Sequence, residues 1–264
     1  MAKIEGLLFD LSGVLYEGER PVPGAVEALE ALKKRYPMRF ITNTTRKTPR
    51  KVWEKLEGMG FDVAPEAVFT ALDAARRTLE TRGAKGRFLV YRDVAAWFDD
   101  LRSDRPDYVV VADAYDDFTY QNLNAAFRDL MAGAKLMAVA KNRYFKDADG
   151  DLSLDAGGFV TLLEFASGQS AEIVGKPAAP FFREAAASMR VDPAHVLMVG
   201  DDIESDIAGA QRAGMRACLV KTGKFRSEDL KREIRPDYLI GSVAELPELL
   251  ERLAAETSPR FPST

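Results

Sequence analysis

Short apolar runs alternate along the chain with longer segments in which apolar residues recur every three or four positions. The short runs predict buried strands, and the helical spacing predicts helices that cover a sheet with one face. The expected strands are residues 4–10, 38–43, 68–70, 86–90, 108–113, 135–140, 171–175, 195–202, 216–220 and 237–240. Strands that alternate with helices predict an α/β protein with a doubly wound parallel sheet.

The segments between these strands have helical periodicity, and several end at glycine, which commonly terminates helices. The expected helices are residues 26–36, 49–60, 71–83, 94–101, 122–133, 159–168, 180–189, 203–214 and 244–255. Residues 141–158 are polar and rich in turn-forming residues, so no strand is predicted there. Some ten strands exceed what one simple sheet needs. We therefore predict a core made of residues 1–77 and 169–264 and an inserted α/β domain at residues 78–168.

Composition excludes several classes of function. The chain has 264 residues, 47% of them hydrophobic, and a net charge of −4 with a pI near 5.3. A mildly acidic chain of this kind does not predict the positively charged surface that binds nucleic acid or an anionic membrane. The single cysteine, Cys218, excludes an internal disulfide and a cysteine-rich zinc site. With no signal-peptide pattern and no apolar run of roughly 18–20 residues, we expect a soluble cytoplasmic protein.

Polar residues cluster where four predicted strands end. These clusters are Asp10, the pair Thr42 and Asn43, Lys176, and the pair Asp201 and Asp202. Taken singly, such residues often cap helices or form turns. In an open parallel sheet, however, ligands bind outside the carboxyl ends of the strands, so these side chains are candidates for one site.

Together the four clusters suit phosphoryl transfer. Asp10 and Asp201 can share Mg²⁺, which prefers oxygen ligands. The hydroxyl of Thr42 and backbone N–H groups near Asn43 can bind phosphate oxygens, and Lys176 can neutralise the charge of the phosphoryl group. Positioning and charge stabilisation carry most of the catalysis in such reactions.

The ordered motifs DLSG, TN, GKP and GDDIESD span residues 10–206. In this order they resemble the haloacid dehalogenase superfamily of aspartate-nucleophile phosphatases. The long insert between TN and GKP is similar to the C2-type cap of the NagD-like branch. The strings DLSGVLY, FITNTT, KNRYFK, VGKP and VKTGKF resemble a subgroup of that branch, one member of which cleaves pyrophosphate and P–N bonds.

The resemblance implies roles for the acidic residues. Asp10 would attack phosphorus and form an aspartyl-phosphate. Asp10, Asp201 and the backbone carbonyl of Ser12 would hold Mg²⁺, while Asp202 and Asp206 would be supporting acidic residues. Thr42, Asn43 and Lys176 would bind the phosphoryl group of a small phosphorylated substrate. The resemblance is also compatible with a homodimer formed through the cap.

Ser12 departs from the pattern of the family, because most members carry aspartate two residues after the nucleophile. A hydroxyl is neither an acid nor a base near neutral pH, and proton transfer is typically worth about 10²–10⁴-fold in rate. Alkyl phosphates should therefore be poor substrates, whereas pyrophosphate or a protonated phosphoramidate can leave without an enzyme-derived proton. Alternatively, Asp147, Asp149 or Asp151 in the insert supplies the proton, although a polar turn is the simpler interpretation of that segment.

The sequence thus predicts a Mg²⁺-dependent phosphatase in which cap closure excludes water and selects the substrate. Two alternatives stay open. A nearly inactive relative could bind a phosphorylated ligand or a protein partner, which the replacement at Ser12 favours. An acceptor other than water could also receive the phosphoryl group.

Overall fold

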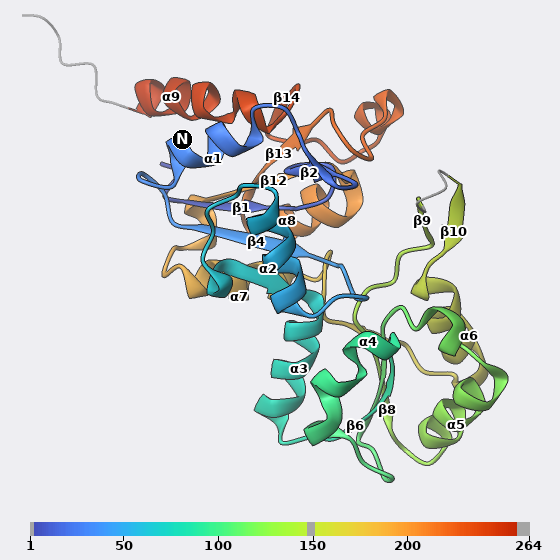
Figure 1. The fold of residues 1–264 in the computed structure, drawn as a ribbon. Helices are drawn as coiled ribbons and strands as arrows, with labels where there is room; N and C mark the ends of the chain where they lie inside the picture. The colour runs from blue at the N-terminus through green and yellow to red at the C-terminus, as the bar shows by residue number, and fades with distance from the viewer. Residues whose placement is uncertain (1–2, 147–150, 258–264) are drawn as a thin grey trace, which may run out of the picture. The chain divides into compact units, whose positions relative to one another are not determined.

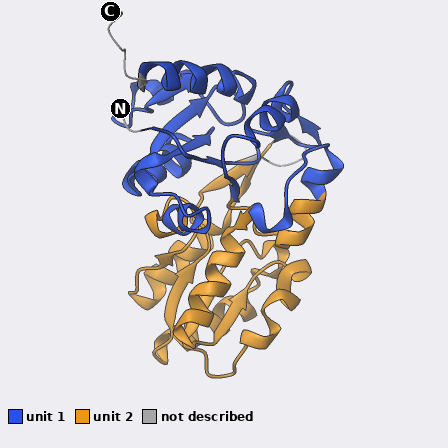
Figure 2. Ribbon diagram, turned by 90° about the vertical axis from the view of Figure 1, so that its left-hand side faces the viewer, with its two compact units in different colours: residues 1–41, 55–67, 182–264 blue, residues 42–54, 68–181 orange. Residues whose placement is uncertain are grey.

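The computed structural model describes residues 3–146 and 151–257. The chain divides into two compact units (Figure 2). Unit 1 comprises Met1–Ile41, Lys55–Ala67 and Phe182–Thr264, and unit 2 comprises Thr42–Glu54 and Val68–Phe181. These limits differ from the predicted domain limits, and the assignment of residues 78–168 as a cap stays a prediction.

A parallel sheet forms the centre of unit 1. The strands of this sheet that begin in unit 1 lie in the order β14 (Tyr238–Ile240), β13 (Arg216–Val220), β12 (Val196–Gly200), β1 (Gly6–Phe9) and β4 (Met38–Thr42) (Figure 1). From β1 the chain continues to β4 on one side, and it later returns through β12 on the other. β1 therefore lies where the strand order reverses, which is the position at which such sheets bind ligands.

The strands of unit 1 form because both faces of the sheet are covered. All four residues of β1 and all five of β12 are buried, which explains their continuous apolar sequences. The rings of Phe9 and Phe40 stack with centroids 5.7 Å apart across the paired strands β1 and β4. The predicted parallel α/β architecture is confirmed.

Helices and short turns connect the strands of unit 1, and α1 lies beside α9 (Figure 1). The helices are α1 (Ala25–Leu32), α8 (Gly209–Arg212) and α9 (Leu246–Thr257), and α2 (Pro49–Gly58) and α7 (Ala179–Ser188) each contain residues of both units. A π-helical turn, η5 (Ile203–Ala208), precedes α8, and 3₁₀ turns lie at Pro65–Ala67, Pro193–His195, Ser227–Lys231 and Val243–Glu245. The strands β2 (Tyr16–Glu17) and β3 (Arg20–Pro21) form a small antiparallel hairpin.

Unit 2 has its own parallel sheet, in the order β11 (Glu172–Ile173), β8 (Lys135–Ala138), β7 (Tyr108–Val111) and β6 (Gly86–Leu89). Its other elements are β5 (Val68–Thr70), α3 (Ala71–Arg82), α4 (Arg92–Ala95), α5 (Tyr120–Met131), α6 (Ala156–Ser167) and the 3₁₀ turns Ala96–Leu101 and Tyr115–Asp117. Leu130 of α5 and Leu163 of α6 pack in one core with Val109 and Val111 of β7. Unit 2 therefore buries a core of its own.

An antiparallel hairpin in unit 2 was not predicted. It pairs β9 (Tyr144–Lys146) with β10 (Leu152–Leu154). Leu152 and Leu154 are 63% and 62% exposed, so these strands lack the buried alternation by which a strand is recognised in a sequence. Asp147 and Asp149, two of the candidate proton donors, lie outside the described residues, whereas Asp151 is exposed.

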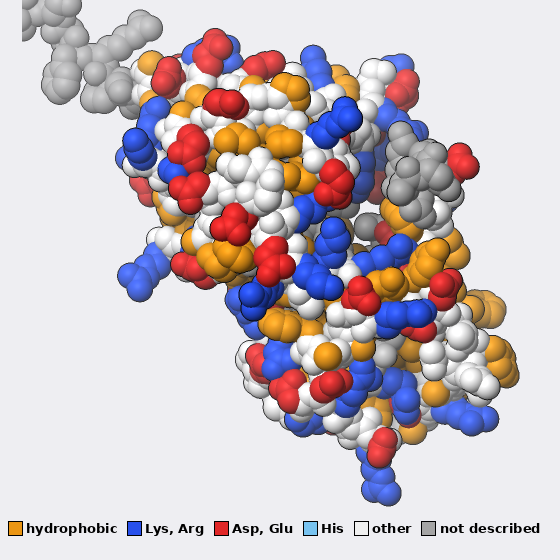
Figure 3. Space-filling model, in the orientation of Figure 1, with side chains coloured by type: hydrophobic (Ala, Val, Ile, Leu, Met, Phe, Trp, Pro, Cys, Tyr) orange, Lys and Arg blue, Asp and Glu red, His pale blue; other side chains and the backbone are white. Residues whose placement is uncertain are grey.

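The surface agrees with the composition. Lys and Arg side chains are interspersed with Asp and Glu side chains over the face seen in Figure 3. Among the described residues, no helix combines the length and the apolar character that a membrane crossing requires.

Candidate active site

Asp10 directly follows β1 at the carboxyl end of the unit 1 sheet. Its backbone N–H donates to the carbonyl of Val199 at 2.9 Å, which continues the pairing of Phe9 with Val199. Only 8% of Asp10 is exposed. The sheet therefore fixes the backbone of the predicted nucleophile.

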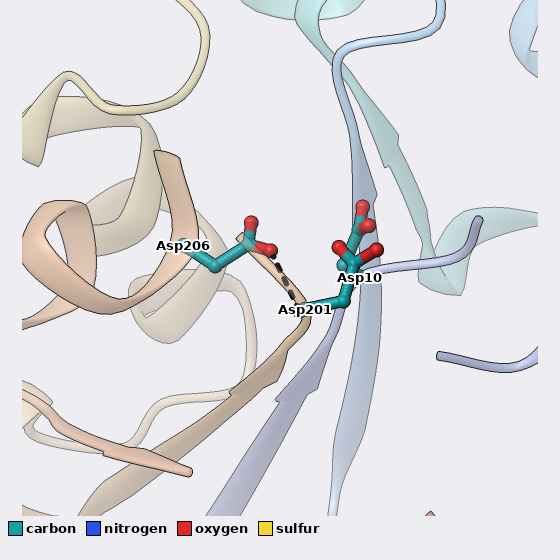
Figure 4. A group of neighbouring side chains, drawn as sticks. All are labelled: Asp10, Asp201 and Asp206. Carbon is teal, nitrogen blue, oxygen red and sulfur yellow. Dashed lines mark hydrogen bonds between the residues drawn. The ribbon is translucent and has the colours of Figure 1, made fainter. Parts of the chain in front are cut away.

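Asp201 and Asp206 lie beside Asp10 (Figure 4). Asp201 follows β12, Asp206 lies in the π-helical turn, and both are buried. Each of the three carboxylates offers an oxygen within 4.8 Å of the other two. Asp206 Oδ2 also accepts hydrogen bonds from the backbone N–H groups of Asp201 and Asp202, each at 3.2 Å, so Asp206 helps to shape the turn that carries Asp201.

The Asp201 carboxylate is the electrostatic centre of this cluster. Burial raises its pKa, and the nearby charges of Asp10 and Asp206 raise it further. Asp201 Oδ1 is buried and has no hydrogen-bond partner in the described part of the chain. Buried carboxylates at this spacing need a compensating positive charge, and an all-oxygen donor set suits a hard divalent cation. The residues present therefore fit Mg²⁺.

The loop that follows β13 holds this cluster, although its residues were not among the predicted site residues. Thr222 Oγ1 donates to the carbonyl of Gly13 at 2.5 Å, and the backbone N–H of Lys224 donates to Asp201 Oδ2 at 2.7 Å. The backbone N–H of Gly223 donates to Glu17 Oε1 at 2.9 Å. The segment KTGK is also a polar cluster at the end of a strand, the same signal that identified Asp10 and Asp201.

Gly13 lets the backbone pass close to Asp201. It has a φ of +88°, a conformation that favours glycine. A Cβ atom at this position would lie 2.1 Å from Asp201 Oδ2. The glycine of the DLSG motif is therefore required both by its backbone conformation and by the lack of space.

Asp202 and Ser12 have different surroundings from the three buried carboxylates. Asp202 Oδ1 accepts from the backbone N–H groups of Glu204 and Ser205 at 3.0 and 2.9 Å, so Asp202 caps the π-helical turn. Lys224 Nζ lies 3.4 Å from Asp202 Oδ2. Ser12 is exposed and lies in the turn that begins the β2–β3 hairpin.

The predicted phosphoryl-binding residues Thr42, Asn43 and Lys176 all belong to unit 2. The side-chain amide of Asn43 accepts from the backbone N–H of Lys176 and donates to its carbonyl, both at 2.9 Å. Thr42 Oγ1 accepts from the backbone N–H of Thr44 at 3.1 Å and bonds the hydroxyl of Thr44 at 2.9 Å. Asn43 therefore holds the backbone of Lys176 through two hydrogen bonds, and both Thr42 and Lys176 are buried. The phosphate-binding roles of the three residues stay predictions.

Comparison with known sequences finds consistent similarity over most of the chain. The family "Haloacid dehalogenase-like hydrolase" matches residues 7–96, and the family "HAD-hydrolase-like" matches residues 173–246. Phospholysine phosphohistidine inorganic pyrophosphate phosphatase of Rattus norvegicus is 40% identical over 258 residues, which are 95% of each chain. Haloacid dehalogenase-like hydrolase domain-containing protein 2 of Bos taurus is 43% identical over 227 residues, 86% of this chain and 87% of the relative.

Comparison with solved structures supports the fold. NagD from E. coli K-12 superposes with a TM-score of 0.83, covering 92% of this chain and 98% of NagD, at 24% sequence identity. This likeness confirms the predicted class, an α/β core with parallel sheets and an inserted α/β part.

Proposed function

Because the chain belongs to the haloacid dehalogenase superfamily, we propose that it is a Mg²⁺-dependent phosphatase of the NagD-like branch, acting through Asp10. Its substrate would be a small phosphorylated compound with a P–O–P or P–N bond. The phosphatase name of the rat relative supports this proposal.

The observation that carries the proposal is the meeting of three buried carboxylates. Asp10, Asp201 and Asp206 offer oxygens within 4.8 Å of one another, and Asp201 Oδ1 has no donor among the described residues. A cluster of buried, ionised carboxylates would lower the stability of the fold if no positive charge compensated it. A bound cation offsets this cost.

Asp10, Asp201 and the carbonyl of Ser12 would hold Mg²⁺, with Asp206 supporting the turn that carries Asp201. When bound, Mg²⁺ supplies positive charge to the oxygens of the transferring phosphoryl group. Lys176, positioned by Asn43, and Thr42 would bind the same phosphoryl group.

The chemical step belongs to Asp10. One oxygen of its carboxylate bonds to phosphorus while the bond from phosphorus to the leaving atom breaks. The electron pair of that bond departs with the leaving group, and water then cleaves the aspartyl-phosphate to release phosphate. Residues 78–168 are proposed to act as a cap that excludes bulk water and selects the substrate.

Ser12 limits the substrates to those whose leaving group can depart without a proton from the enzyme. Its hydroxyl neither protonates a leaving alkoxide nor activates water efficiently, since it has no suitable pKa. A phosphate leaving group, or an amine that arrives protonated, needs no such acid. This reasoning favours P–O–P and P–N substrates over alkyl phosphates.

A protein that only binds a phosphorylated ligand or a partner is the rival function, and the absence of an acid at Ser12 favours it. The two functions differ in the role of Asp10, because binding alone does not need a nucleophile.

Turnover measurements separate the two. Purified protein with Mg²⁺ is assayed on pyrophosphate, a phosphoramidate, p-nitrophenyl phosphate and an alkyl phosphate, beside the variant Asp10→Asn. We expect hydrolysis of the first two substrates by the wild type and loss of turnover in Asp10→Asn. Equal rates for the two proteins on all four substrates would exclude the enzyme.

A further inference from the structure

The guanidinium of Arg46 in unit 2 contacts one carboxylate and three aromatic rings. Its Nε donates to Asp113 Oδ2 at 2.5 Å. The guanidinium carbon lies 4.5 Å from the ring centroid of Tyr115, 4.9 Å from that of Phe145 and 5.9 Å from that of Tyr91. Cation–π contacts and the carboxylate therefore restrict the orientation of the guanidinium plane.

The partners of Arg46 are themselves fixed. Asp113 is only 8% exposed, and its Oδ1 accepts from the backbone N–H of Tyr115 at 2.9 Å. The backbone N–H of Asp113 donates to Thr45 Oγ1 at 3.3 Å, which ties this residue to the neighbour of Arg46. Tyr115 has a φ of +50°, although it is neither glycine nor asparagine. Such strained residues persist where the surroundings determine the conformation, and they concentrate at functional sites.

One edge of the guanidinium has no partner among the described residues and can bind a ligand. Nη1 and Nη2 have no hydrogen-bond partner within residues 3–146 and 151–257, and the Arg46 side chain is 30% exposed. These two nitrogens carry four N–H donors in one plane. That arrangement matches two oxygens of a phosphate, and its orientation is fixed before any ligand arrives.

The position of this edge links it to the proposed phosphoryl-binding residues. Arg46 follows Asn43 by three residues, so their Cα atoms are at most about 11 Å apart. Tyr91 and Asp113 each follow a strand of the unit 2 sheet by two residues, β6 and β7 respectively, so the cluster lies at the carboxyl ends of these strands.

We propose that Arg46 is a second anion subsite, which binds the phosphate that leaves when a P–O–P bond is broken. This inference rests on the proposed function and narrows its substrate class to pyrophosphate-type compounds. When the bridging oxygen departs with the electron pair of the P–O bond, negative charge grows on the second phosphate, and the Nη donors of Arg46 stabilise it. A cationic amine leaving group gains nothing from this arrangement, and Ser12 need not supply a proton.

Ligand binding tests the subsite without turnover. Isothermal titration calorimetry at saturating Mg²⁺ compares methylenediphosphonate, whose P–C–P bridge is not hydrolysed, with methylphosphonate. We expect Arg46→Gln to weaken the diphosphonate about 10- to 100-fold, the range for hydrogen bonds to a charged group, and the monophosphonate less than about threefold. Arg46→Lys should bind the diphosphonate with an affinity between those of the wild type and Arg46→Gln, because lysine keeps the positive charge but lacks the planar pair of Nη donors. Arg105→Gln, at an exposed arginine of the same unit, is the matched control for net charge.

Loss of Arg46 leaves the buried Asp113 without its cation, so the double variant Arg46→Gln/Asp113→Asn guards against misfolding. It should show the same selective loss. Equal weakening of both phosphonates, or no weakening of either, overturns the subsite. A selective loss in a protein that hydrolyses nothing would retain the subsite and reject the phosphatase. Pyrophosphate hydrolysis that is the same in Arg46→Gln and Arg105→Gln would retain the phosphatase and reject the subsite.

Discussion

The backbone N–H of Lys224 holds Asp201 Oδ2 at 2.7 Å, while Asp201 Oδ1 has no hydrogen-bond donor among the described residues. One oxygen of the carboxylate is thus used to orient the other. The donor is a main-chain group in the loop after β13, so a change of the Lys224 side chain alone does not remove it.

Replacement of Thr222 tests the role of this loop. Thr222→Val removes the hydroxyl that donates to the carbonyl of Gly13 but keeps the shape of the side chain. We expect a loss of about 0.5–1.5 kcal/mol in the free energy of unfolding and weaker Mg²⁺ binding. Urea denaturation with and without Mg²⁺ measures both effects. Thr222→Ser retains the hydroxyl donor, so its free energy of unfolding and its Mg²⁺ binding should be close to those of the wild type. An equal loss of stability in both variants would contradict the assigned hydrogen bond.

Gly13→Ala should disrupt the acidic cluster much more than Gly18→Ala. Both glycines have positive φ, so each alanine costs roughly 1–2 kcal/mol in backbone conformation. A Cβ at Gly13 meets Asp201 Oδ2 at 2.1 Å, whereas a Cβ at Gly18 meets no atom within 4 Å. The Mg²⁺-induced shift in Tm should therefore be lost in Gly13→Ala and kept in Gly18→Ala. If both variants keep it, the close approach of Gly13 to Asp201 is unimportant for metal binding.

Removal of the Asp201 charge should change the pH dependence of stability. The pKa of Asp201 is raised in the folded state, from an ordinary value of 3.8, chiefly by burial. Its contribution to stability is therefore fully present below about pH 4 and is lost as the pH rises through the folded pKa. Without metal, Asp201→Asn should unfold at a higher temperature than the wild type at pH 8, and this difference should shrink toward pH 4. Each unit by which the pKa of Asp201 differs between the folded and unfolded states corresponds to about 1.4 kcal/mol in the free energy of unfolding.

Bound Mg²⁺ should offset the cost of the ionised Asp201 carboxylate in the wild type. Because a bound carboxylate is ionised, Mg²⁺ should raise the Tm of the wild type more at pH 8 than at pH 5. Asp201→Asn should show little shift with Mg²⁺ at either pH. Differential scanning fluorimetry with and without Mg²⁺ measures the shift in Tm for both proteins at both pH values. A shift in the wild type that does not depend on pH would rule out Asp201 as the titrating ligand.

Ser12→Asp should restore an acid and base beside Asp10. We expect turnover of alkyl phosphates to rise by about 10²–10⁴-fold, while turnover of pyrophosphate changes little, because its leaving group needs no proton. Steady-state kinetics on both substrates is the measurement, and Ser12→Asn is the neutral control of similar size. A rise that Ser12→Asn shares, or no rise at all, would contradict the assigned effect of the serine.

Much of the architecture follows from patterns that depend on burial. The strands β1 and β12 are buried on both faces, so their apolar runs predict them, and the aspartates that end them are predicted as neighbours. The exposed hairpin β9–β10 carries no such pattern and was therefore not predicted.

The partners of individual side chains were harder to predict. Asp202 and Asp206 look alike in the motif GDDIESD, yet one is a partly exposed cap and the other is buried. Their roles depend on the π-helical turn, whose hydrogen bonds do not follow the regular helical spacing. The contribution of Thr222 and Lys224 was detectable in principle, since KTGK follows a strand as the other site clusters do.

The pair of hydrogen bonds between Asn43 and Lys176 also has a consequence for the time course of synthesis. These residues are 133 positions apart. At about 5–20 residues per second, a ribosome needs roughly 7–27 s after Asn43 to add Lys176. A growing chain therefore lacks this pairing until almost all of unit 2 has been made, and a fragment released before that point cannot form it.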